Sequence, residues 1–432
     1  MPSFIQRIKR CTAAQILDSR GMPTIEVELV CDNGLGEETS VKAAVPSGKS
    51  TGSGEALAIR DSDGGVLQAI ENVEKKIAPA IIDGEVSSEE IDHIMLSLDT
   101  TRDKHYLGAN AMLGVSQAAM RLEAKTKNMP LWKFVSKRSG FPVGKPKLYV
   151  NTLNGGVHAD FSLPFQEYII VIGSATFAEG NAKAKDIFEK VRKHLDEKKI
   201  DYYMGDEGGF APRLSDIDEP FQILTDCVGN DPDIFLAIDA AASEFYKKEK
   251  GKYEMFGKEI SPGELLVKYK ELVEKFNLRS IEDPFYEKDH KGFGEIVTWI
   301  GESTLIVGDD LTVTNPVLIK DYGERLLATG VIIKPNQIGT MSETFDAIRE
   351  AREFGWKVIV SHRSGETMDT FIADLAVGVG AYGIKAGAHA QPERAAKYDR
   401  LVEIEKEMEA DTLEIQRIKE ERDAENRKRP YY

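Results

Sequence analysis

Short apolar strands alternate with amphipathic helices over most of the chain from about residue 144, and this alternation restricts the possible folds more than any other feature. The expected strands cover residues 234–238, 278–281, 304–307, 330–333, 356–360 and 382–384. Amphipathic helices are expected between them, near residues 265–276, 316–327, 342–354 and 369–380. Repeated strand–helix units predict right-handed crossovers and a parallel sheet. Six or more such units suit a closed (β/α)8-type barrel better than an open sheet.

The first part of the chain has a different pattern. Residues 24–30 alternate apolar and polar side chains in strand fashion, and helices follow, one of which is expected to begin at a cap formed by Asn110. We therefore predict an α/β protein with two domains. The smaller is an N-terminal α+β domain at residues 1–143, and the larger is a barrel domain at residues 144–432 that ends in a charged tail.

The composition is that of an ordinary folded protein, with 41% hydrophobic and 30% charged residues. A formal net charge of -16 argues against nucleic acid or an anionic membrane as the main partner. The three cysteines are scattered, without metal or redox spacing, which favours a reducing, cytoplasmic compartment. No apolar run has the length of a signal-peptide core or of a membrane span.

Charged residues stand at the ends of the expected barrel strands. Three carboxylates close successive strands, namely Asp239, Glu282 and Asp309, and two lysines, Lys334 and Lys385, close later ones. In a parallel barrel these ends all lie at the same mouth, where active sites are found. A lysine directly after the apolar run 331–333 is unusual, and its alternative interpretation is a side chain that snorkels to solvent.

Three carboxylates on adjacent strands repel one another unless a positive charge lies between them. A hard divalent cation meets this need, and an all-oxygen set of ligands favours magnesium. The alternative is a set of ordinary salt bridges with nearby lysines. A lysine beside a bound divalent cation has a lowered pKa, so Lys334 is a candidate general base.

The segment His362-Arg363-Ser364 follows another strand and predicts an anionic ligand. An arginine binds a phosphate or carboxylate in bidentate fashion, and a serine adds a hydroxyl donor. Two glycine-rich turns carry further candidates, His158 with Gln166 and Glu167 beyond the first turn, and Glu207 in the second. By the residues alone, Glu207 has the common alternative of a turn carboxylate that faces water, and His158 has that of a histidine held by its own loop.

The loop at residues 46–54 contains Gly48-Lys49-Ser50-Thr51, which suggests a phosphate-binding loop. That motif requires a glycine where Ala43 stands, and it requires a helix directly after the lysine, which Gly52 opposes. A lid, or a loop that brings a hydroxyl to a metal, is favoured instead.

Six strings of residues in one order resemble the enolase family, and the resemblance covers the chain from about residue 11 to about residue 405. They are Asp18-Ser19-Arg20-Gly21, Gly205-Asp206-Glu207-Gly208-Gly209, Ser280-Ile281-Glu282-Asp283-Pro284-Phe285, Asp309-Asp310-Leu311-Thr312-Val313-Thr314-Asn315-Pro316, Lys334-Pro335-Asn336-Gln337-Ile338-Gly339-Thr340 and Ser361-His362-Arg363-Ser364-Gly365-Glu366-Thr367. The resemblance implies a small α+β domain and a barrel whose first strands depart from strict alternation. It also implies a homodimer, or an octamer built from dimers.

The activity implied by the resemblance is the magnesium-dependent, reversible dehydration of 2-phospho-D-glycerate to phosphoenolpyruvate in glycolysis and gluconeogenesis. The implied catalytic residues are Lys334, which removes the proton at carbon 2, Glu207, which protonates the leaving hydroxyl, Glu167 beside it, and His362. The implied substrate-binding residues are His158, Gln166, Glu167, Arg363, Ser364 and Lys385, of which Arg363 and Ser364 would take the phosphate and Lys385 the carboxylate.

Two magnesium ions per site are implied. Asp239, Glu282 and Asp309 would hold the first, and Ser50 would hold the second together with the substrate phosphate. Lys49 and Met368 depart from the family pattern without removing a catalytic group. Two alternative functions stay open. One is a related barrel lyase or racemase, and the other is a binding protein with the enolase fold. A secondary cell-surface or secreted pool, beside the cytoplasmic one, also stays open.

Overall fold

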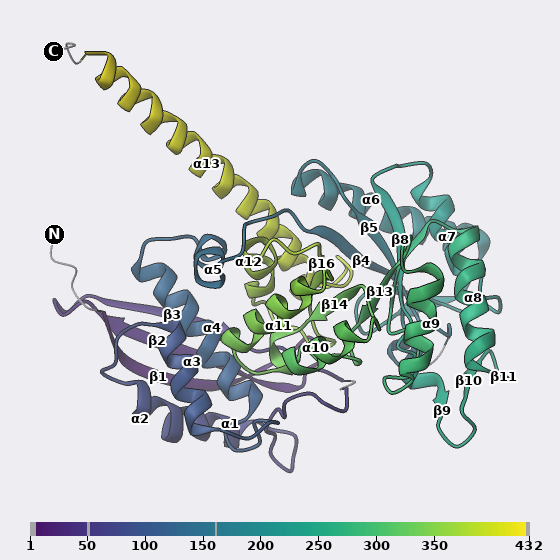
Figure 1. Ribbon diagram of the computed structural model, residues 1–432, viewed down its shortest axis with the longest axis horizontal. Coiled ribbons are helices and arrows are strands. Elements are labelled where there is room, and N and C mark those ends of the chain that lie inside the picture. Colours follow the sequence, from purple (N-terminus) through teal and green to yellow (C-terminus); the bar gives the residue numbers. More distant parts are fainter. Residues whose placement is uncertain (1–5, 50–51, 160–161, 429–432) are drawn as a thin grey trace.

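The computed structural model describes residues 6–49, 52–159 and 162–428, without the side chains of residues 158, 414, 415 and 418–428. The N-terminal part holds a three-stranded antiparallel sheet in the order β1-β2-β3, formed by Arg7–Leu17, Pro23–Asp32 and Glu38–Ala44. Helices cover one face of this sheet, namely α1 (Leu67–Asn72), α2 (Ala78–Ile81), α3 (Ser88–Leu98), α4 (Ala109–Thr126) and α5 (Leu131–Ser139) (Figure 1). A single π-helical segment, Val73–Ile77, joins α1 to α2.

The alternation predicted for residues 24–30 is confirmed, since Ile25, Val27 and Leu29 are fully buried beneath α4. Gly114 of α4 allows this close packing, because a Cβ there would lie 2.6 Å from Cγ2 of Val27. The predicted cap at Asn110 is wrong. Helix α4 begins after Gly108, whose φ of 93° favours glycine, and the Asn110 side chain instead bonds both backbone polar groups of Ile59.

Eight strands form the predicted closed barrel, in which β16 pairs with β4. They are β4 (Lys147–Asn154), β5 (Glu167–Ile172), β8 (Ile234–Asp239), β12 (Leu278–Glu282), β13 (Leu305–Gly308), β14 (Gly330–Ile333), β15 (Lys357–Ser361) and β16 (Gly383–Lys385). The surrounding helices are α6 (Phe177–Lys198), α7 (Glu219–Val228), α8 (Pro262–Lys275), α9 (His290–Ile300), α10 (Pro316–Glu324), α11 (Met341–Glu353), α12 (Phe371–Gly378) and α13 (Pro392–Lys428).

The start of the barrel departs from strict alternation, as expected. Strand β5 is antiparallel to both of its neighbours, β4 and β8, whereas the other barrel pairings are parallel. A short hairpin of β6 (Tyr202–Met204) and β7 (Phe210–Pro212) attaches to β4 through Leu153 and Phe210. A second small sheet is formed by β9 (Tyr246–Lys247), β10 (Lys252–Met255) and β11 (Lys258–Ile260).

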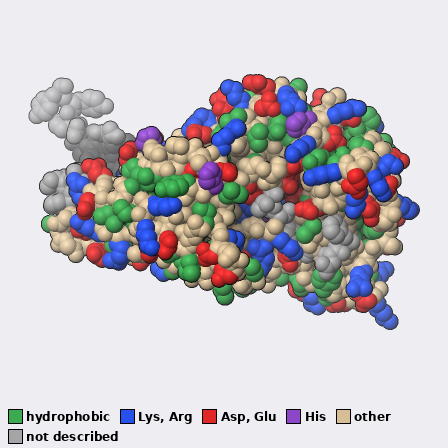
Figure 2. Space-filling view, turned by 90° about the horizontal axis from the view of Figure 1, so that it is seen from below, with side chains coloured by type: hydrophobic (Ala, Val, Ile, Leu, Met, Phe, Trp, Pro, Cys, Tyr) green, Lys and Arg blue, Asp and Glu red, His purple; other side chains and the backbone are tan. Residues whose placement is uncertain are grey.

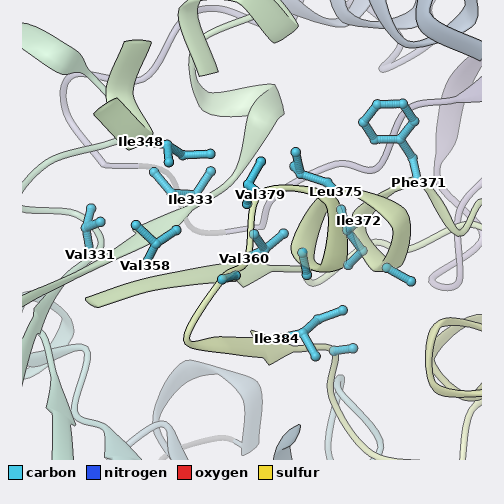
Figure 3. Packing of buried hydrophobic residues seen from close by; sticks show 14 of the residues in the cluster. Val331, Ile333, Ile348, Val358, Val360, Phe371, Ile372, Leu375, Val379 and Ile384 are labelled. Carbon is cyan, nitrogen blue, oxygen red and sulfur yellow. The ribbon is translucent and has the colours of Figure 1, made fainter. Parts of the chain in front are cut away.

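The barrel strands are buried on both faces, which explains their continuous apolar runs. Val331 and Ile333 of β14 point toward the helices that surround the barrel and lie near Val358 and Ile348 (Figure 3). The residue between them, Ile332, belongs to a separate apolar cluster with residues of β4, β5, β8, β13 and β15. Because alternate residues of a strand face opposite sides, this second cluster fills the barrel interior beneath the mouth.

The C-terminal helix α13 runs along the barrel and then projects away from the body of the molecule (Figure 1). The charged tail predicted from the sequence forms the projecting part of this helix. Basic and acidic side chains are interspersed over the face shown in Figure 2. None of the helices that the structure describes is long and apolar enough to span a membrane.

Candidate active site

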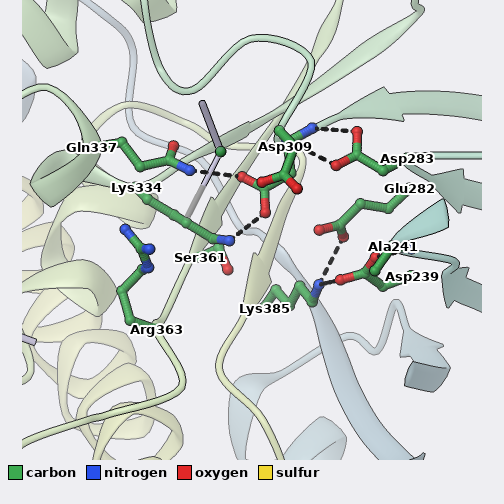
Figure 4. A network of polar contacts seen from close by, with 12 residues as sticks. Asp239, Ala241, Glu282, Asp283, Asp309, Lys334, Gln337, Ser361, Arg363 and Lys385 are labelled. Carbon is green, nitrogen blue, oxygen red and sulfur yellow. Dashed lines mark hydrogen bonds and ion pairs between the residues drawn. The ribbon is translucent and has the colours of Figure 1, made fainter. Parts of the chain in front are cut away.

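The mouth of the barrel gathers the predicted charged residues. Asp239, Glu282 and Lys385 are the last residues of β8, β12 and β16, and Asp309 and Lys334 directly follow β13 and β14 (Figure 4). The carboxyl ends of parallel strands meet at one edge, so residues far apart in sequence become neighbours.

Glu167 reaches the same edge from the opposite direction. It is the first residue of β5, and because β5 is antiparallel its start lies at the mouth, in register with Asp239. Gln166 precedes it, and its Nε2 lies 3.5 Å from Oδ2 of Asp239.

Lys385 lies at the centre of a buried cluster of carboxylates. Its Nζ is 2.9 Å from Oε1 of Glu167, 2.9 Å from Oδ2 of Asp239 and 2.8 Å from Oε2 of Glu282. Burial lowers the pKa of this ammonium, but the surrounding carboxylates outweigh burial and raise the pKa well above its usual range. Lys385 is therefore a permanent positive charge that holds three acids together.

Lys334 forms a second ion pair. Its Nζ contacts Oδ2 of Asp309, and Oδ1 of the same carboxylate accepts a hydrogen bond of 2.9 Å from Nε2 of Gln337. Burial works to lower the pKa of Lys334, but the charge of Asp309 prevails and raises it. Lys334 was predicted to be a neutral base, but its pKa is raised while its ammonium contacts Asp309 directly.

The three carboxylates predicted as magnesium ligands are divided between the two lysines, so the salt bridges considered as an alternative are present. A need for a cation persists nevertheless. Oε1 of Glu282 and Oε2 of Glu167 are buried and make no hydrogen bond to any described residue. Burial, followed by the charge of Asp239, raises the pKa of Glu282 well above its usual range. Orphaned, buried carboxylate oxygens fit a hard cation.

The strand-end rule identified Asp309 but missed its neighbours Asp283 and Asp310. Asp283, Asp309 and Asp310 offer oxygens close enough to hold one metal ion, and carboxylate oxygens of Glu167 and Glu207 together with a ring nitrogen of His362 form a second such group. Asp283 also orients its neighbours, because its carboxylate accepts hydrogen bonds from the backbone N–H groups of Asp309 (3.0 Å) and Asp310 (2.7 Å). Its left-handed φ of 41° is a strained conformation of the kind that clusters at functional sites.

Glu207 lies in the turn between β6 and β7 and is buried, with one oxygen accepting a hydrogen bond of 3.1 Å from Nδ2 of Asn151. Steric contacts explain why glycines flank Glu207. A Cβ at Gly205 or Gly209 would lie 2.5 or 2.7 Å from Oδ1 of Asn154, so the turn can pack there only without side chains. His362 approaches from β15, with Nε2 3.8 Å from Oε1 of Glu207.

Arg363 is held in a fixed orientation by a residue that sequence reasoning missed. Its two terminal nitrogens lie 3.0 and 3.1 Å from the two carboxylate oxygens of Glu55, and Nη1 also donates to Oδ1 of Asn336. Glu55 belongs to the N-terminal domain, so this pair joins the two parts of the chain. Ser364 accepts hydrogen bonds from Nη1 of Arg20 and from the backbone of Lys49.

The side chains surround a small polar pocket that opens to solvent. Of the predicted site residues, its lining includes Gln166, Glu167, Glu207, Asp239, Asp309, Lys334, His362, Arg363, Ser364 and Lys385. Glu282 lies beside it through its contact with Lys385. Ser50 lies outside the described residues, and at His158 the structure describes the backbone only.

A barrel with lysines, carboxylates and an arginine at its mouth defines an enzyme that works on a small anion. Comparison with known proteins makes this more specific. The model of the enolase N-terminal domain matches residues 8–135, and that of the enolase C-terminal TIM barrel domain matches residues 142–419. The chain is 45% identical to the enolase of Thermococcus gammatolerans and 44% identical to that of Thermococcus kodakarensis, each over 93% of this chain and 95% of the relative. It is 44% identical to the enolase of Pyrococcus furiosus, over 92% and 94%. This chain belongs to the enolase family.

Proposed function

We propose that this protein is an enolase, a lyase that reversibly dehydrates 2-phospho-D-glycerate to phosphoenolpyruvate in glycolysis and gluconeogenesis. The observation that supports the proposal is that Lys334, the candidate base, and Glu207, the candidate acid, line one pocket. Lys334 follows β14, and Glu207 lies on the hairpin attached to β4, beside β5. Around the closed ring β4 is three strands from β14, and Glu207 lies close to Glu167 of β5, the strand opposite β14.

Removal of a proton beside a carboxylate creates a doubly charged enediolate, so the reaction needs both a base and a concentration of positive charge. A cation bound by Asp309 would remove the ion pair of that carboxylate with Lys334 and lower the pKa of the lysine. Lys334 in its neutral form then takes the proton from carbon 2, and Lys385 faces the substrate carboxylate. Glu207 in its acid form then gives a proton to the hydroxyl at carbon 3, which leaves as water while the carbon–carbon double bond forms. Glu167, close to Glu207, shapes the environment of that acid.

Two magnesium ions complete the proposed site. Asp239, Glu282 and Asp309 would hold the first, and Ser50 with the substrate phosphate would hold the second. Bound there, magnesium would neutralise the carboxylates and stabilise the negative charge that develops on the substrate. Arg363 and Ser364 would bind the phosphate, while Gln166, His158 and His362 would line the pocket. We further propose a cytoplasmic homodimer, or an octamer of dimers. The projecting tail is the feature that suggests a secondary surface pool.

The direct test supplies 2-phosphoglycerate and magnesium to the full chain and follows the ultraviolet absorbance of the enol phosphate. We expect product that disappears when magnesium is chelated and in Lys334→Ala. The exposed Lys320 on α10 provides a matched control, and Lys320→Ala should keep full activity. Turnover of a non-phosphorylated acid with none of 2-phosphoglycerate would instead favour a related lyase or racemase.

A further inference from the structure

Arg394, near the start of α13, is fully buried and lies beside the site without entering the cavity described above. Neither the strand ends nor the family resemblance identified it. A buried guanidinium is costly to desolvate and normally carries a carboxylate partner. Among the described residues, no carboxylate lies within ion-pair distance of Arg394.

The guanidinium instead donates its five N–H groups to five neutral acceptors. Nε donates to Oε1 of Gln391 at 2.7 Å, and Nη1 donates to Nδ1 of His362 and to the backbone oxygen of Arg363 at 3.2 Å. Nη2 donates to the backbone oxygens of Ser364 at 3.0 Å and of Asp206 at 3.2 Å. One side chain thus links the segment that carries His362, Arg363 and Ser364 to the turn that carries Glu207.

These contacts also decide where the proton of His362 lies. Arginine has donors and no acceptor, so Nδ1 of His362 must accept from Arg394 and the ring proton must sit on Nε2. Nε2 is the nitrogen that faces Oε1 of Glu207 across 3.8 Å. The imidazole therefore presents a fixed donor toward the acid side of the cavity.

The chain after β16 is shaped to accommodate this arrangement. Gly387 has a φ of +77°, and a Cβ there would lie 2.3 Å from Cδ of Arg394 and 2.9 Å from Cε1 of His362. Gln391 adds a second link, because its Nε2 donates to the backbone oxygen of Asp206 at 3.1 Å while its Oε1 receives Arg394.

We propose that Arg394 is a positioning residue of the enzyme, which holds His362 in the Nε2–H form and ties the Glu207 turn to the Arg363–Ser364 segment. The inference deepens the proposed function and rests on it for the roles of Glu207 and Arg363. The charged groups that face His362 are Arg394 from α13, Glu207 from the β6–β7 turn, Lys385 from β16 and Lys334 after β14. Burial, followed by the charge of Arg394, holds the pKa of His362 well below its usual range.

The unaltered protein provides the first test, which needs no substrate. In full-length protein with 15N-labelled histidine rings, long-range 1H–15N spectra report the protonation of each ring, and loss of one signal set in His362→Gln assigns the residue. We expect a neutral ring with its proton on Nε2 at pH 7. A proton on Nδ1, or a charged ring, would overturn the proposal. Because this reading does not depend on turnover, it stands apart from any failure of the enolase assay.

Variants test the positioning itself. Arg394→Gln should populate both ring forms and reduce kcat/KM by about 10- to 100-fold, the loss typical when a partner that orients a functional histidine is removed. Arg394→Lys keeps the positive charge but loses the planar, forked set of N–H donors, so it should also lose activity.

Arg400, two turns along α13, is the matched control, since its ion pairs with Asp374 and Glu407 lie away from the site. Arg400→Gln should lower thermal stability while the His362 signals and kcat/KM stay unchanged. Full activity in Arg394→Lys, or identical kinetics in Arg394→Gln and Arg400→Gln, would refute the positioning role. If Arg394→Gln does not fold, the spectrum of the unaltered protein and the lysine variant still decide.

Discussion

Lys385 shows how a single buried cation organises the site. Three acids from three different strands converge on its ammonium within 2.9 Å. Each would be costly to bury as an unpaired charge, and burial already raises the pKa of Glu167 and Glu282 well above the usual range. Lys385 therefore stabilises the carboxylates at the mouth, in addition to the substrate contact proposed for it.

Replacement of Lys385 by methionine should lower the free energy of unfolding by about 3–5 kcal/mol, because removal of one partner leaves buried charges uncompensated. Magnesium should restore more stability to this variant than to the unaltered chain, since a cation can take over the lost neutralisation. Urea unfolding followed by circular dichroism, with and without magnesium, measures both effects. Lys320→Met on the exposed face of α10 should change stability by no more than about 0.5 kcal/mol. An equal change in the two variants would contradict this account of Lys385.

At the scale of elements, two helical glycines allow the effect of packing on stability to be measured apart from the effect of helix propensity. Gly323 of α10 faces the Phe354 ring, and a Cβ there would lie 2.3 Å from Cδ2. For Gly263, in the first turn of α8, a Cβ would lie within 4 Å of no described atom apart from its chain neighbours and the backbone of the same helix. The same substitution should therefore have opposite effects at the two positions.

Gly323→Ala should destabilise the protein by about 1–3 kcal/mol, because overpacking against the partly buried Phe354 ring exceeds the gain in helix propensity. Gly263→Ala should stabilise it by roughly 0.5–1 kcal/mol, because alanine loses less conformational freedom on folding. Thermal unfolding of the two variants beside the unaltered chain checks the pair. Stabilisation by both substitutions would mean that α10 can move away from Phe354 at little cost.

The elements were predictable where a regular pattern decides the structure. The six later barrel strands and the residues that close them followed from periodicity, because parallel strands bring their ends together. Glu167 did not follow from that rule, since it opens an antiparallel strand. Glu55 and Arg394 were also out of reach. Each is an ordinary charged residue in sequence, and only the docking of a distant loop or helix brings it to Arg363 or His362.

At the scale of the whole molecule, the two parts of the chain meet through buried polar contacts. Asp92 of α3 accepts hydrogen bonds from the backbone N–H and the hydroxyl of Ser342 at the start of α11. Arg121 of α4 forms a bidentate pair with Asp369, with both contacts at 2.6 Å. We propose that the domains are residues 1–143 and 144–432, with these contacts as part of their interface.

Asp92 predicts a pH dependence of stability. Burial raises its pKa to about 6, so the folded state binds this proton more tightly than the unfolded state does. Its contribution to stability is therefore greatest at low pH and is lost as the pH rises from about 4 to about 6. Asp92→Asn cannot ionise, so its stability relative to the unaltered chain should increase by about 1–3 kcal/mol between pH 4.5 and pH 7.5.

Urea unfolding at those two pH values measures this difference. Asp346→Asn, on the exposed face of α11, is the control and should show little change between the two conditions. A relative stability of Asp92→Asn that stays constant or falls with rising pH would contradict the raised pKa of Asp92.

In the proposed reaction Lys334 acts as the base and Glu207 as the acid, from different sides of the barrel mouth. The most direct measurement incubates 2-phosphoglycerate with magnesium in deuterium oxide and follows the proton at carbon 2 by NMR. Glu207→Gln should exchange this proton for deuterium while forming almost no phosphoenolpyruvate, because proton removal needs only the base. Lys334→Ala should show neither exchange nor product. Exchange in Lys334→Ala together with its absence in Glu207→Gln would assign the base to the opposite side of the cavity and contradict the account.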